Sequence, residues 1–236
     1  MLRLPIAADS AFDSAKVLSA QSFCLEGTQH DILCKIGDWA EDPSGELILW
    51  LYSMASTGKS SIALTVADAL KHRRRLTTGR DPPRTAFLGA SFFFKQVDST
   101  RNDIQRFFTT IAWSLAEVFD DFKPLLAHAV GDNLTIGTKA PQQQLQHLLV
   151  ETLSILYGKT FLPIRLIVVV DALDECVGRS QAKELISLLA LQLKDLQKVR
   201  LRVLITSRRE EHIQQAFSQL EEGLHRPVPL EKIGRE

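Results

Sequence analysis

Apolar runs of strand length, each followed at once by polar residues, constrain the fold of this chain more than any other feature of its sequence. The clearest are Leu47–Tyr52, Leu166–Val170 and Leu201–Ile205. A strand that is apolar on both faces is covered on both faces, which is typical of the central parallel sheet of an α/β protein. Parallel neighbours require crossover connections, so we expect helices in the segments between these runs.

The intervening segments carry the periodicity of helices. Apolar side chains recur every three or four residues in the segments 32–39, 62–70, 104–119, 145–156, 182–196 and 213–220. A further strand is predicted over 87–94 and an edge strand over 228–230, whereas 131–141 is predicted as a loop. The pattern predicts an α/β fold with a mainly parallel sheet, divided into an N-terminal arm over 1–28 and a core over 29–236.

Composition and charge narrow the range of partners. Lys plus Arg and Asp plus Glu both number 28, and the resulting zero net charge argues against a nucleic-acid partner. No apolar run approaches the roughly 20 residues of a membrane span, so no membrane association is expected. Three widely spaced cysteines fit neither a disulfide framework nor a metal site, which favours a reducing compartment, the cytoplasm. The basic segment Lys71–Arg84 is either a solvated loop or a patch for phosphate or nucleic acid.

The first polar cluster joins the strand at 47–52 to the helix at 62–70. It resembles the phosphate-loop pattern Gly-x-x-x-x-Gly-Lys-Ser/Thr at Gly58, Lys59 and Ser60, and in its position between a strand and a helix. In such a loop backbone N–H groups hold the phosphates, the lysine reaches the β and γ oxygens, and the hydroxyl ligates Mg²⁺. We therefore expect ATP or GTP to bind through Ser53, Met54, Ala55, Ser56, Thr57, Gly58, Lys59, Ser60 and Ser61.

The first position of the pattern is different, because Ser53 stands where a glycine is usual. Glycine at this position avoids backbone strain and crowding of the phosphates. Serine is a small substitute, so we expect nucleotide binding to be weakened rather than lost. The alternative is a chance Gly-Lys-Ser at the start of a helix.

Acidic residues form the second cluster, directly after the strand at 166–170. Asp171 is placed to hold a water ligand of Mg²⁺ opposite Ser60. Glu175 is the expected general base for an attacking water, and Asp174 is expected to assist. The alternative is that these carboxylates only stabilise the start of a helix, through their attraction to the positive end of its dipole.

The third cluster, Thr206-Ser207-Arg208, follows the strand at 201–205. Arg208 is expected to contact the γ-phosphate of a nucleotide, or else to be a solvated charge beside Arg209. Ligands of parallel sheets bind at the carboxyl ends of the strands, so the three clusters should meet there. Together they predict a P-loop NTPase fold, a three-layer α/β/α sandwich.

The same segments resemble the NACHT branch of the STAND NTPases, and in particular the fungal NOD-like receptor type with a nephrocystin-like N-terminal domain. The resemblance covers about 23–217 and is carried by Cys24–Thr28, Trp39-Ala40, Leu88–Phe94, Thr110–Ala112, Asp171–Cys176 and Thr206–Arg208. Members of this type usually have glycine at the positions of Ser53 and Ser56, and often arginine at that of Gln29.

The resemblance implies a nucleotide-dependent conformational switch in a signalling protein of innate immunity, with slow Mg²⁺-dependent hydrolysis. It implies self-association or effector domains as partners, and a core truncated before the helical and winged-helix elements of the family. Two other classes stay open. The serines of the loop fit a degenerate domain that serves as an interaction scaffold, and the basic segment fits a nucleic-acid motor, which the zero net charge opposes.

Overall fold

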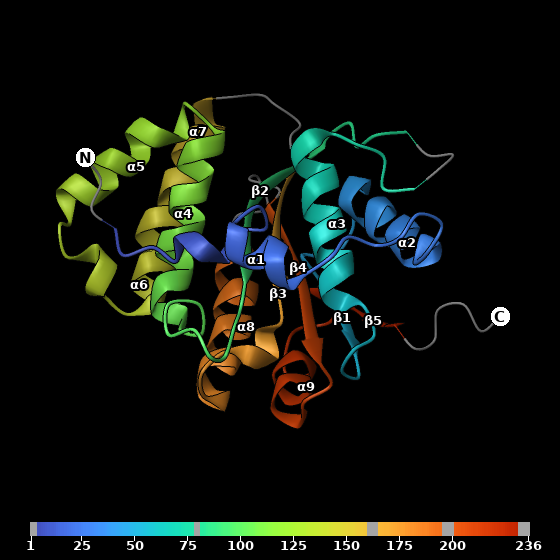
Figure 1. Ribbon diagram of the computed structural model, residues 1–236. Helices are drawn as coiled ribbons and strands as arrows, with labels where there is room; N and C mark the ends of the chain where they lie inside the picture. The colour runs from blue at the N-terminus through green and yellow to red at the C-terminus, as the bar shows by residue number, and fades with distance from the viewer. Residues whose placement is uncertain (1–3, 78–80, 160–164, 195–200, 231–236) are drawn as a thin grey trace.

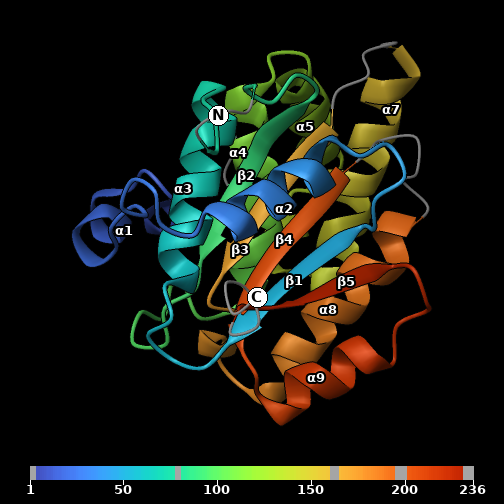
Figure 2. The ribbon, with the colours of Figure 1, turned by 90° about the vertical axis from the view of Figure 1, so that its right-hand side faces the viewer.

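A five-stranded parallel sheet forms the centre of the molecule and carries helices on both faces (Figures 1 and 2). The computed structural model describes residues 4–77, 81–159, 165–194 and 201–230. The strand order is β2-β3-β4-β1-β5, and the strands are β1 (Ile48–Ser53), β2 (Ala86–Phe93), β3 (Arg165–Asp171), β4 (Leu201–Arg208) and β5 (His225–Pro229). The predicted three-layer α/β/α architecture is confirmed. The edge strand predicted over 228–230 is present but begins earlier, at His225, and ends at Pro229.

Alternate residues of the strands enter two separate hydrophobic clusters. In β1, Ile48 and Trp50 belong to one cluster, and Leu49 and Leu51 belong to the other. The face of Leu49 is covered by α2 (His30–Glu41) and α3 (Lys59–His72). The opposite face is covered by α4 (Phe107–Val118), α5 (Phe122–Asp132), α7 (Thr152–Lys159), α8 (Arg179–Lys194) and α9 (Glu211–Ser218). Burial on both faces is the physical reason for the apolar strands.

Some elements differ from the sequence-based expectations. Helix α5 lies where the sequence predicts none, and only every fourth residue of it is buried (Phe122, Leu126, Val130). The helix predicted over 145–156 begins as the π-helix η4 (Leu145–Glu151), which α6 (Pro141–Gln144) precedes. Strand β4 continues beyond its predicted end, because it pairs with β1 as far as Arg208. Short 3₁₀ turns are η2 (Ile104–Arg106), η3 (Ile136–Thr138), within the predicted loop, and η5 (Leu173–Glu175).

The N-terminal segment crosses in front of β2, between α4 and α3 (Figure 1). It contains η1 (Ala8–Ser10) and α1 (Ala15–Ala20). The backbone N–H of Phe12 donates to the Ser91 hydroxyl of β2 at 2.9 Å, and that of Ala7 donates to the Thr110 hydroxyl of α4 at 2.9 Å. The segment is therefore fastened to the edge strand and to its neighbouring helix.

Buried arginines hold the carboxyl end of α2. Arg202 of β4 donates through Nη1 to the backbone carbonyl of Trp39. Arg165 of β3 donates through Nη1 to the carbonyls of Ala40 and Glu41. The last carbonyls of a helix lack partners within it and carry partial negative charge, so cationic donors stabilise them. These contacts fix α2 to the amino ends of two central strands.

Replacing Arg202 with methionine is expected to lower the free energy of unfolding by about 2–3 kcal/mol, since the Trp39 carbonyl then loses its donor. Arg226 is the matched control, because its side chain is 40% exposed and pairs with Glu46. Arg226→Met is expected to cost less than about 1 kcal/mol. Urea unfolding measures both, and equal losses in the two variants would contradict the anchoring role of Arg202.

Candidate functional site

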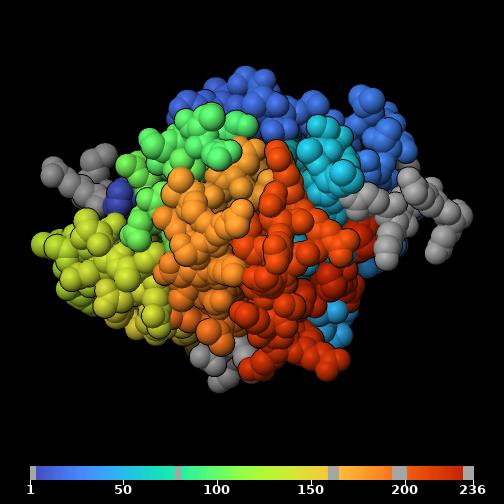
Figure 3. Space-filling view, turned by 90° about the horizontal axis from the view of Figure 1, so that it is seen from below, coloured from blue at the N-terminus to red at the C-terminus, as the bar shows by residue number. Residues whose placement is uncertain are grey.

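The carboxyl ends of the central strands lie in one row. Ser53 of β1 pairs with Arg208 of β4, and Phe93 of β2 pairs with Asp171 of β3. Strand β4 lies between β3 and β1. The three polar clusters are therefore at the same edge of the sheet, where the segments that follow β1 (cyan), β3 (orange) and β4 (red) lie side by side (Figure 3).

The loop between β1 and α3 turns through two residues with a left-handed backbone. Ser56 has a φ of 58° and Gly58 a φ of 88°. Gly58 caps α3, and its carbonyl accepts the N–H of Ile62 at 3.0 Å. The N–H groups of Lys59 and Ser60 belong to the first turn, where a helix offers them no internal partner. Together with the positive end of the helix dipole, they suit an anion such as phosphate.

Ser53 occupies the position of the first glycine without a positive φ. Its side chain is buried, and its hydroxyl contacts Thr57 Oγ1 and accepts a hydrogen bond from Lys59 Nζ at 3.0 Å. The Lys59 ammonium also donates to the backbone carbonyls of Ser53 at 3.2 Å and Met54 at 2.6 Å. The lysine thus lies along the loop, and Ser53 gives it one contact that glycine could not make.

Asp171, the last residue of β3, is buried and joins the other two clusters. Thr206 of β4 donates to its Oδ1 at 2.6 Å, and the Ser60 hydroxyl also hydrogen-bonds to its carboxylate. The phosphate loop and the acidic segment therefore meet at one carboxylate. The sequence assigned no separate role to Thr206, because only the register of β4 against β3 brings it to Asp171.

Asp174 and Arg208 form an ion pair. The backbone N–H of Arg208 donates to Asp174 Oδ1 at 2.9 Å, and its Nε lies 3.2 Å from Oδ2. The Asp174 side chain is only 8% exposed, whereas that of Arg208 is 53% exposed. The guanidinium of Arg208 is thus held by an acidic residue of the neighbouring cluster, while Arg209 lies over the ring of Tyr52.

Glu175 contacts residues that follow β2. Its Oε2 accepts the backbone N–H of Gln96 at 3.0 Å and lies 3.3 Å from Lys95 Nζ. Sequence reasoning gave Lys95 and Gln96 no part in the site. The available signal was their position, since they follow the carboxyl end of a strand that the parallel sheet places beside β3.

Comparison with known families identifies the chain. Residues 27–208 match the family described as nephrocystin 3, N-terminal, and the matched region contains every residue of the candidate site. The chain belongs to the nephrocystin 3 N-terminal family. A comparison with curated proteins found no significant match.

Within the site of this nephrocystin 3 N-terminal chain, Asp171 is the group whose pKa is shifted most clearly by its surroundings. Burial raises its pKa to about 6, and the carboxylates of Asp174 and Glu175 add to the rise. The hydroxyls of Thr206 and Ser60 act in the opposite direction. Desolvation disfavours the charged form of a carboxyl group, and a cation placed beside it reverses that cost.

Replacement of Asp171 with asparagine is expected to stabilise the metal-free protein at neutral pH. The folded chain binds the proton of Asp171 more tightly than the unfolded chain, where the pKa is 3.8, so this group favours folding below pH 4. The contribution is lost as the pH rises through 6 and amounts to about 3 kcal/mol. Asp171→Asn should therefore melt above the wild type at pH 7 in EDTA and close to it at pH 4. A variant that is no more stable than the wild type at pH 7 would contradict a free-energy cost of burying the charged carboxylate.

A divalent cation fits the donors around Asp171. The buried carboxylate accepts hydrogen bonds from the neutral hydroxyls of Thr206 and Ser60, and the neighbouring carboxylates of Asp174 and Glu175 carry charge of the same sign. The hydroxyl of Ser60 and the carboxylate of Asp171 are oxygen ligands of the kind that Mg²⁺ prefers. Among the described parts of the chain, no cluster of three or more His, Cys, Asp or Glu side chains could hold a metal ion. A Mg²⁺ ion here would need further ligands from water and phosphate.

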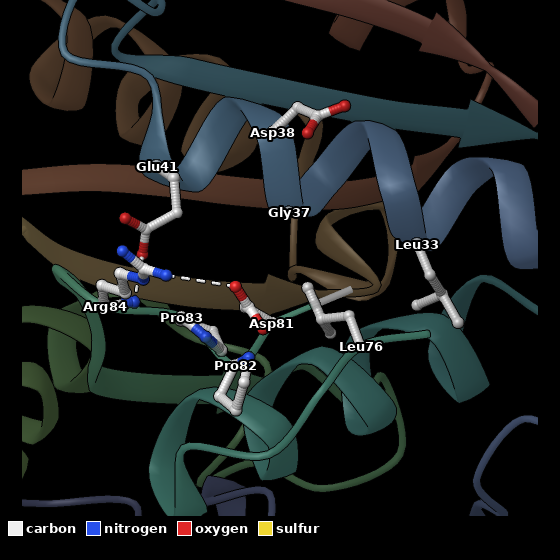
Figure 4. Close-up of a pocket in the computed structure, with 9 residues that line it drawn as sticks. All are labelled: Leu33, Gly37, Asp38, Glu41, Leu76, Asp81, Pro82, Pro83 and Arg84. Carbon is white, nitrogen blue, oxygen red and sulfur yellow. Dashed lines mark hydrogen bonds and ion pairs between the residues drawn. The ribbon is translucent and has the colours of Figure 1, made fainter. Parts of the chain in front are cut away.

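A cavity of about 310 Å³ between α2 and the segment that leads to β2 is lined by no residue of the phosphate loop (Figure 4). Among the described residues that line it, Asp38, Glu41 and Asp81 bring carboxylates, whereas Arg84 pairs with Asp81 at 3.1 Å. A surplus of negative charge disfavours a polyphosphate. The described lining is therefore less suited to a nucleotide than the first turn of α3 is. Within the described ranges, no helix has the length and apolar character needed to cross a membrane.

Proposed function

We propose that this chain binds ATP or GTP with Mg²⁺ at the loop Ser53–Ser61, and that the nucleotide acts as a conformational switch in a signalling protein. The observation that carries the proposal is the meeting of the phosphate loop with the acidic segment, since Ser60 hydrogen-bonds to Asp171. Membership in the nephrocystin 3 N-terminal family supports a place among the NACHT-type STAND NTPases. The sequence resemblance extends the proposal to a cytoplasmic protein of the fungal NOD-like receptor type.

The phosphates would be held by this chain's own groups. The first-turn N–H groups of α3, which begins at Lys59, would donate to phosphate oxygens. The ammonium of Lys59 lies on the loop carbonyl of Met54 at 2.6 Å, and it would rotate toward the β and γ phosphates on binding. The exchange of carbonyl acceptors for charged oxygens strengthens its hydrogen bonds.

Hydrolysis would use the acidic segment. Ser60 and Asp171 would hold Mg²⁺, which supplies charge neutralisation at the phosphates. Glu175 is the proposed general base for the attacking water, and Arg208, held by Asp174, is the proposed contact of the γ-phosphate. Glu175 follows β3 and Arg208 ends the neighbouring strand β4, so both residues lie at the same edge of the sheet, which supports these roles.

A second candidate function is a non-hydrolysing fold that serves as an interaction scaffold. It is favoured by the Ser53 hydroxyl, which accepts a hydrogen bond from Lys59 Nζ at 3.0 Å. A lysine held in this way binds a phosphate only after it gives up that contact. Both candidates leave self-association or effector domains as partners in the signalling protein, and neither needs a nucleic acid or a membrane.

Titration with fluorescent ATP and GTP in the presence of Mg²⁺ separates the two functions. Ser53→Gly is expected to raise affinity by about three- to tenfold, because it removes one hydrogen bond from Lys59 and opens space for phosphate. Ser53→Ala is the matched control, since it removes the hydroxyl and keeps the Cβ, and it should raise affinity less. Binding by the wild type supports the switch. Binding only after Ser53→Gly and Ser56→Gly are combined would support the scaffold.

A further inference from the structure

The loop that follows β2, Lys95–Asn102, lies between Glu175 and the N-terminal segment. We infer that this loop positions the Glu175 carboxylate, and that Asp9 and Lys16 of the N-terminal segment fix the loop. The inference rests on the proposed function for the chemical role of Glu175, but the contacts that carry it are independent of nucleotide. Lys95 and Asp98 are accordingly positioning residues, which act on the chemistry through another side chain.

The loop holds Glu175 by one oxygen. Both the Gln96 N–H, at 3.0 Å, and the Lys95 ammonium, at 3.3 Å, contact Oε2. Within the described parts of the chain, no hydrogen bond or ion pair engages Oε1. The Glu175 backbone is fixed as well, because its N–H donates to the Ala172 carbonyl at 2.8 Å. A carboxylate held in this way keeps one oxygen in a set direction to accept a proton from water.

The loop closes on itself and joins the segment after β3. The Lys95 N–H donates to the Arg101 carbonyl at 3.0 Å, and the Asn102 side-chain amide donates to the Gln96 carbonyl at 2.8 Å. The Asn102 carbonyl in turn accepts the N–H of Val177 at 2.6 Å. The loop is therefore joined both to the Glu175 carboxylate and to Val177, two residues after it.

Asp98 connects the loop to the N-terminal segment. Its Oδ1 accepts the Thr100 N–H at 3.0 Å and the Thr100 hydroxyl at 2.7 Å. Its Oδ2 lies 3.0 Å from Arg101 Nε and 3.5 Å from Lys16 Nζ. The Arg101 side chain is only 9% exposed and donates through Nη1 to the Asp9 carbonyl at 3.3 Å. Two contacts therefore join loop and segment, that of Asp98 with Lys16 and that of Arg101 with the Asp9 carbonyl. Within the segment, Lys16 also pairs with the Asp9 carboxylate at 2.7 Å.

Amide hydrogen exchange tests the connection without any nucleotide. Asp98→Asn keeps an oxygen for Thr100 and removes the charge that holds Arg101 and Lys16. It is expected to speed exchange of the Gln96 and Val177 amides about tenfold. Asp13→Asn is the matched control, since it makes the same charge change at an exposed position of the same segment, and it should leave both rates unchanged. Faster exchange confined to 98–101 would overturn the inference.

Single-turnover hydrolysis tests the role in the reaction. Lys95→Met and Asp98→Asn are each expected to lower the rate about tenfold and to leave nucleotide affinity within about twofold of wild type, with Lys95→Arg restoring most of the rate. Unchanged rates, or rate and affinity lost together, would overturn the positioning role. A wild type that binds or hydrolyses no nucleotide would refute the proposed function, while the exchange rates still decide whether the contacts of Asp98 hold the loop.

Discussion

Lys59→Ala is expected to weaken Mg²⁺-nucleotide binding by about 100-fold. In the free protein the Lys59 ammonium donates to the carbonyls of Ser53 and Met54 and to the Ser53 hydroxyl. On nucleotide binding these acceptors would be exchanged for phosphate oxygens, and hydrogen bonds between charged groups contribute about 1.5–3 kcal/mol each. Isothermal titration calorimetry with ATP and GTP measures the loss.

The matched control is Lys71→Ala, because Lys71 lies exposed in the last turn of the same helix. It makes the same charge change to the domain and should leave nucleotide affinity within about twofold. Circular dichroism checks that both variants keep the helical content of the wild type. Equal losses in the two variants would show that overall charge, and not the phosphate loop, determines binding.

Glu175→Gln is expected to lower the rate of hydrolysis by about 100-fold or more and to leave nucleotide affinity nearly unchanged. Glutamine keeps an oxygen for the Gln96 N–H, which donates to Glu175 at 3.0 Å, but it cannot take a proton from water. Loss of a general base costs about 10²- to 10⁴-fold. Phosphate release under single-turnover conditions gives the rate.

Glu222→Gln, at an exposed position in the segment between α9 and β5, is the control for the loss of one carboxylate. It should hydrolyse nucleotide at the wild-type rate. If Glu175→Gln does so as well, Glu175 is not the base. The loop that holds it would then have no role in hydrolysis through this side chain. A variant that loses affinity together with rate would indicate a structural role.

The fold could be predicted from local patterns because the parallel sheet imposes them. Burial of β3 on both faces requires the uninterrupted apolar run Leu166–Val170, and Asp171 directly after it marks the end of the strand. Helix α5 was missed because apolar residues such as Leu125 and Ala127 also lie between its buried positions Phe122, Leu126 and Val130, which blurs the helical stripe.

The site could be predicted only as far as each cluster is local in sequence. Thr206, Lys95 and Gln96 were missed because their contacts with Asp171 and Glu175 depend on which strands are neighbours. The pattern also gave no reason why Ser53 is tolerated. The left-handed residues of the loop are Ser56 and Gly58, so glycine at 53 is not needed for the backbone, and its loss acts through the contact with Lys59.

The central claim is that the phosphate loop and Asp171 form one site for a nucleotide with Mg²⁺. Titration of ATP and GTP with Mg²⁺ and with EDTA, on the wild type and on Asp171→Asn, tests it most directly. We predict that Mg²⁺ tightens binding to the wild type at least about tenfold and has little effect on the variant. Nucleotide affinities that depend neither on Mg²⁺ nor on the charge of Asp171 would contradict the claim.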